Sequence, residues 1–167
     1  MHHPSLGLPP SDPSAGLPAA AATLRANRER IARTALRETI RMSPGFDERY
    51  DEQMLRLMLR DFDRHIEQLA RALETGEDGY VTNYGEWLVP IYRRRRIPMN
   101  DLTMMLGGLK RAVAAVLSPS DNEVAHEMLH QMVVRLMHHR RLPGDHKGNS
   151  IIRFFWKGAG VGDESVI

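Results

Sequence analysis

Two histidines and a glutamate, in His126-Glu127-Met128-Leu129-His130, match the H-E-x-x-H pattern of zinc hydrolases. In that pattern histidines one helical turn apart hold the metal, and the glutamate activates a bound water. A third ligand is hard to supply, because His138 lies eight residues further along the same predicted helix, about 12 Å away. The three side chains also point away from the apolar side of that helix. We expect a solvent- or partner-facing histidine pair, with a zinc-dependent hydrolase that uses Glu127 as the alternative.

His65 flanks the apolar side of another predicted helix, beside Phe62 and Leu69. From such a position a histidine could ligate haem iron in a helical pocket. Gly107 and Gly108 would give a flat ligand room in a later helix, although glycines in a helix interior also mark the close approach of another backbone. We expect a packed histidine and a helix crossing. A globin-like sensor of tetrapyrrole or another small apolar ligand is the alternative.

Two further groups of residues are candidates for partner binding. Residues 93–96 are four consecutive arginines at the end of a predicted helix, where cations complement the helix dipole. Residues 151–157 hold three adjacent aromatic side chains between two cations, which is typical of an interface anchor. The candidate residues are Ile151, Ile152, Phe154, Phe155, Trp156, Arg93, Arg94, Arg95 and Arg96. Packing of residues 151–157 on the chain's own core is an alternative of equal weight to partner binding.

The helices that carry these residues are predicted from apolar spacing. Residues 100–117 are the most continuously apolar part of the chain and predict a central helix with neighbours on most sides. Further helices are predicted over residues 19–42, 47–75, 80–95 and 121–142. Gly76 would cap the second, Pro90 would kink the third, and Ser120 with Glu123 would form a capping box at the start of the last. The core face predicted for that last helix is Ala125, Met128, Leu129, Met132, Val133 and Leu136.

The predicted fold is therefore all-α, a single bundle of four to five helices, with a globin-like arrangement as one option. We assign the bundle to residues 19–143. Residues 1–18 are rich in proline and are expected to form a flexible arm, and residues 144–167 an aromatic and glycine-rich docking tail.

Composition narrows the class of protein. The 167 residues include no cysteine, which excludes disulfides and thiolate metal sites and fits a reducing, bacterial-type cytoplasm. No apolar run is long enough to span a bilayer. The net charge is only +2, so we do not expect a nucleic-acid partner.

Residues 87–113 resemble the helix–xxPLxDL–helix passage of RsbR-type sensor N-terminal domains, at Pro98, Asp101, Leu102 and Leu109. The resemblance implies a dimeric, non-enzymatic sensing or scaffolding module, usually without haem. Because only 25 residues follow Leu142 in this sequence, we expect it to depart from the family in having no downstream output domain.

These observations predict a non-catalytic interaction or scaffold protein without a cofactor. We expect it to be a homo-oligomer or a small subunit of a larger complex, and to dock protein partners through its termini.

Overall fold

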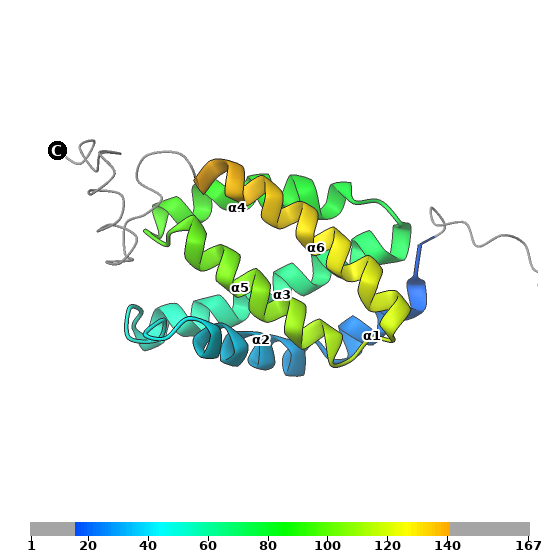
Figure 1. Cartoon of the computed structure of the whole chain (residues 1–167), viewed down its shortest axis with the longest axis horizontal. Helices are drawn as coiled ribbons and strands as arrows, with labels where there is room; N and C mark the ends of the chain where they lie inside the picture. The colour runs from blue at the N-terminus through cyan, green and yellow to red at the C-terminus, as the bar shows by residue number, and fades with distance from the viewer. Residues whose placement is uncertain (1–15, 141–167) are drawn as a thin grey trace, which may run out of the picture.

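The computed structural model describes residues 16–140, which form helices and turns without any strand (Figure 1). The elements are α1 (Pro18–Ala26), α2 (Arg28–Met42), α3 (Glu52–Thr75), α4 (Gly79–Arg94), α5 (Met99–Ala114) and α6 (Pro119–Arg140). The all-α prediction is confirmed. Within the described residues, no helix combines the length and the apolar character that crossing a membrane requires.

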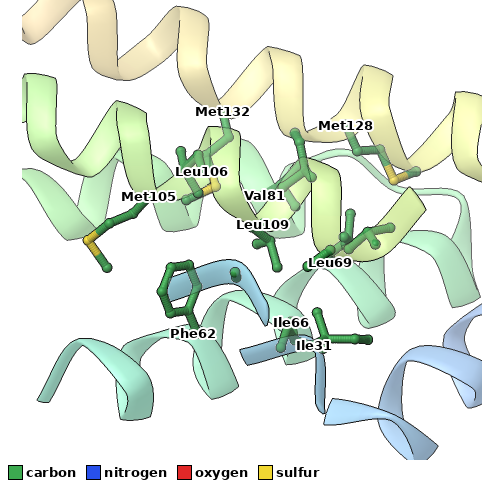
Figure 2. Packing of buried hydrophobic residues seen from close by; sticks show 14 of the residues in the cluster. Ile31, Phe62, Ile66, Leu69, Val81, Met105, Leu106, Leu109, Met128 and Met132 are labelled. Carbon is green, nitrogen blue, oxygen red and sulfur yellow. The ribbon is translucent and has the colours of Figure 1, made fainter. Parts of the chain in front are cut away.

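Helix α5 contacts α2, α4 and α6, and α3 contacts α1, α2, α4 and α6. The predicted central helix therefore shares the centre of the bundle with α3. Figure 2 shows Leu106 and Leu109 of α5 between Phe62 of α3 and Met132 of α6. All four side chains are buried, so the core is a continuous apolar contact among these helices.

The predicted helix over residues 19–42 is broken at Asn27, which separates α1 from α2. The Asn27 side chain donates a hydrogen bond from Nδ2 to the Thr23 carbonyl at 2.9 Å and competes locally with the backbone ladder. The folded part also begins earlier than predicted. Pro18 is the first residue of α1, and the Leu17 amide donates to the Leu73 carbonyl at 2.5 Å.

Helix α3 begins at Glu52, five residues later than the predicted start. Asp51 caps it, accepting a hydrogen bond from the Met54 amide at 2.7 Å, and residues 43–50 form turns that bury Phe46. The predicted end is confirmed: Gly76 has a φ of 73°, and its amide donates to the Ala72 carbonyl at 2.8 Å.

The predicted capping box of α6 is wrong. The helix begins at Pro119, which suits the first helical position, and the Asp121 amide donates to the Ser118 hydroxyl at 3.3 Å. The predicted core face is confirmed, with Val133 partly buried and the other five residues buried. Helix α4 closely matches its predicted bounds and continues through Pro90.

The two glycines of α5 lie where it crosses α2, which confirms the expected close approach of another backbone. A Cβ on Gly108 would collide with the Ala35 carbonyl oxygen and the Thr39 hydroxyl. A Cβ on Gly107 would lie 3.2 Å from the terminal methyl of Met42, a flexible neighbour. The tight contact therefore falls on Gly108, while Gly107 faces an adjustable side chain.

We predict that Gly108→Ala lowers the free energy of unfolding by about 1–3 kcal/mol, because the added methyl forces the α2 backbone away. Gly107→Ala is the matched control. It should be neutral or raise that free energy by up to about 1 kcal/mol, since alanine favours the helix. Urea unfolding of both variants measures the difference, and equal stabilities would contradict the assigned crossing.

Candidate functional site

A buried carboxylate, Asp61 of α3, ties α3 to α4. Asp61 is only 3% exposed. Arg95, just after α4, brings a guanidinium nitrogen to 2.5 Å from Oδ2, and the Tyr92 hydroxyl donates to the same oxygen at 2.8 Å. The Arg95 guanidinium also lies 5.6 Å from the centroid of the Tyr92 ring. The charge of Asp61 is thus balanced by a cation that is itself packed on an aromatic ring.

His65 lies one helical turn after Asp61 and is 2% exposed. Its Nδ1 is 2.9 Å from the Tyr84 hydroxyl, and its Nε2 is 3.4 Å from the Tyr92 hydroxyl. Burial lowers the pKa of His65 to about 4 and raises the pKa of both tyrosines. His65, Tyr84 and Tyr92 are therefore all uncharged near pH 7. Both ring nitrogens have protein partners, and ligation of haem iron by His65 would require one of these contacts to break.

A second buried carboxylate, Asp101, lies in the first turn of α5 and is 1% exposed. Arg49 reaches Oδ1 at 2.9 Å, and the Tyr50 hydroxyl donates to Oδ2. These contacts attach the turn segment of residues 43–50 to the start of α5. They were not predicted, because the apolar spacing placed Arg49 and Tyr50 inside the predicted helix over residues 47–75.

Tyr84 connects the buried polar group to an open groove between α3 and α4, which we call the aromatic groove. Its lining residues are Gln68, Glu77, Gly79, Tyr80, Asn83, Tyr84 and Trp87, and its volume is about 410 Å³. The rings of Tyr84 and Trp87 stack at 24° with centroids 5.6 Å apart. Trp87 is 52% exposed and Tyr80 37%. The spacing of residues 80, 84 and 87 along one helix face was the overlooked signal.

Exposed large apolar side chains of the described residues are confined to two helices. Tyr80 and Trp87 belong to α4, while Val124, Val134 and Met137 belong to α6. The two helices contact each other. Exposed apolar surface on adjacent elements is typical of a recognition surface.

The H-E-x-x-H residues lie apart from the aromatic groove and are engaged locally. His126 is half-buried with Nε2 3.1 Å from the Lys110 carbonyl oxygen, and Glu127 accepts a hydrogen bond from Gln131 at 2.6 Å. His130 is exposed. In the part of the chain that the structure describes, no three histidine or acidic residues come together as metal ligands.

The four consecutive arginines do not form one surface. Arg93 and Arg94 are exposed, whereas Arg95 turns inward to Asp61. Arg96 has a φ of 58°, and hydrogen bonds of 2.9 Å run from its amide to the Arg93 carbonyl and from the Ile97 amide to the Tyr92 carbonyl. This pair of bonds is a Schellman motif with arginine at the left-handed position usually held by glycine.

The aromatic candidates Ile151, Ile152, Phe154, Phe155 and Trp156 lie outside the described residues. Among known proteins, no family model and no curated protein matches the chain. The geometry therefore carries the functional interpretation: buried polar groups that join helices, and an aromatic groove that is open to a ligand or partner.

Protonation of His65 should destabilise the fold. Its pKa is about 4 in the folded state against 6.5 normally, so between these values the unfolded chain binds more protons and stability falls as pH falls. A difference of about 2.5 between the pKa values corresponds to a loss of about 3 kcal/mol. Above pH 6.5 the contribution is complete. Urea unfolding from pH 4 to 7.5 should show that His65→Gln loses this part of the slope; an unchanged slope would contradict the assignment.

Replacing Arg96 by glycine should raise the free energy of unfolding by about 0.5–1 kcal/mol, because glycine adopts the left-handed conformation without the cost borne by other residues. Arg94→Gly, two residues earlier and in helical conformation, is the control and should lower it by up to about 1 kcal/mol. Thermal and urea unfolding of both proteins test the pair. If Arg96→Gly destabilises as much as Arg94→Gly, the conformation of the turn is not as described.

Proposed function

We propose that this protein is a non-catalytic helical interaction module that associates with another copy of itself through the aromatic groove of α4 and the apolar residues Val134 and Met137 of α6. The observation that carries this proposal is the confinement of the exposed large apolar side chains of the described residues to these two contacting helices. Tryptophan and tyrosine are the residue types that most often dominate binding energy at protein interfaces. Trp87 and Tyr80 are therefore the proposed anchors.

The buried polar groups support the proposal that the chain's ionisable residues hold its helices together. Asp61 and Asp101 each accept from an arginine and a tyrosine of another segment, and His65 lies between two tyrosine hydroxyls. Such pairs fix the relative positions of helices, because a buried carboxylate is costly unless it stays paired. The interaction surface then rests on a preorganised scaffold.

The similarity of residues 87–113 to RsbR-type sensor domains agrees with this proposal, since that family implies a dimeric, non-enzymatic module. The proposal includes no cofactor. It includes a cytoplasmic location, which is supported by the lack of cysteine in the 167 residues.

Trp87→Ala should weaken self-association at least about tenfold, the loss of about 1.4 kcal/mol or more expected at an interface anchor. The melting temperature of the dissociated protein should change little, because Trp87 is half exposed. Sedimentation equilibrium over a wide concentration range gives both dissociation constants. Arg33→Ala, on the exposed side of α2, is the control and should associate like the wild type. A wild-type protein that stays monomeric throughout, or a variant with unchanged affinity, would contradict the proposal.

A further inference from the structure

A second groove lies beside the start of α6 and differs from the aromatic groove in charge. It is lined by Asp78, Glu123, Val124, Glu127, Met128 and Gln131 and has a volume of about 440 Å³. Val124 and Met128 supply apolar surface, and three carboxylates accompany them. We call it the acidic groove.

The carboxylates of the acidic groove are not neutralised by the rest of the described chain. Asp78, Glu123 and Glu127 are exposed, and none of them has an ion-pair partner among the side chains of residues 16–138. Arg135, one turn beyond Gln131, is 4.0 Å from Glu86. An apolar surface accompanied by unpaired carboxylates suits an occupant that is both apolar and cationic.

One segment of the chain outside the described residues has this chemistry. Residues 151–157 combine two isoleucines and three aromatic residues with Arg153 and Lys157. Residues 1–15, the other terminal segment, contain no lysine or arginine. Charge complementarity therefore favours the C-terminal segment over the N-terminal one.

The connection between α6 and residues 151–157 is long enough for this C-terminal segment to reach the acidic groove. From Arg140, the last residue of α6, the helix returns to Glu127 over 13 residues, or about 20 Å. Ten residues separate Arg140 from Ile151, and an extended chain of that length spans up to about 33–36 Å. The segment can thus meet the acidic groove of its own chain.

We propose that residues 151–157 dock in the acidic groove of the same chain, with their apolar side chains on Val124 and Met128 and with Arg153 and Lys157 beside the three carboxylates. The contact covers Val124 and leaves the aromatic groove open. This inference does not rest on the proposed self-association, because it concerns a different groove and a contact within one chain.

The 167 residues contain no cysteine, so one nitroxide can be attached at a chosen site. Ser120 is exposed and lies one helical turn before Glu123, near the acidic groove. In ¹⁵N-labelled Ser120→Cys protein carrying the nitroxide, the indole N–H signal of Trp156 should be lost and should return after the label is reduced. Trp156→Phe assigns the signal.

A mixture of nitroxide-labelled ¹⁴N protein with unlabelled ¹⁵N protein separates contacts within a chain from contacts between chains. The proposal predicts that the Trp156 signal is retained in the mixture. Loss of the signal in the mixture as well would show that a second copy's segment fills the groove, and retention in both samples would show that the segment binds elsewhere; either result overturns the proposal.

Charge reversal tests the role of the carboxylates. Glu123→Lys with Glu127→Lys should restore the Trp156 signal in the labelled protein, and adding Arg153→Glu with Lys157→Glu should abolish it again. Glu77→Lys, in the aromatic groove, is the matched control and should leave the signal lost. A reversal without effect would overturn the proposed pairing. Trp87→Ala should also leave the signal lost, which separates this test from that of self-association.

Discussion

The position of α4 depends on one buried charge, the carboxylate of Asp61. A carboxylate that is 3% exposed loses nearly all its water and is tolerated only with close cationic and hydrogen-bonding partners. Arg95 and Tyr92 supply them from the end of α4, at 2.5 and 2.8 Å. Since both partners must face α3, the rotation of α4 about its axis is set, and Trp87 on the same helix is left half exposed.

Asp101 applies the same constraint at the start of α5, where Arg49 and Tyr50 hold the turn segment on the first turn of this helix. The α2–α5 crossing then needs a residue without a side chain at Gly108. These contacts are specific in position, whereas apolar cores in general tolerate alternative packing when their total volume is kept. Together they explain how a small helical bundle presents a defined aromatic groove rather than a variable surface.

Much of the fold could be predicted from the sequence, because apolar spacing determines which side of a helix is buried. The core face of α6 follows from this rule, while the cap at Gly76 follows from the freedom of glycine to adopt the left-handed conformation. The break at Asn27 and the late start of α3 could not be predicted, since side-chain hydrogen bonds and the distant partner Asp101 decide them. For the same reason, the run of four arginines at residues 93–96 did not indicate that Arg95 alone turns inward toward Asp61. The aromatic groove had a signal in the spacing of Tyr80, Tyr84 and Trp87.

A double-mutant cycle between Asp61 and Arg95 tests most directly whether this buried pair holds α4 in place. Free energies of unfolding would be measured by urea for the wild type, Asp61→Asn, Arg95→Gln and the double variant. The structure predicts a favourable coupling of about 1–3 kcal/mol, because the residues share a desolvated charge pair. A coupling within about 0.3 kcal/mol of zero, with wild-type stability in both single variants, would contradict it.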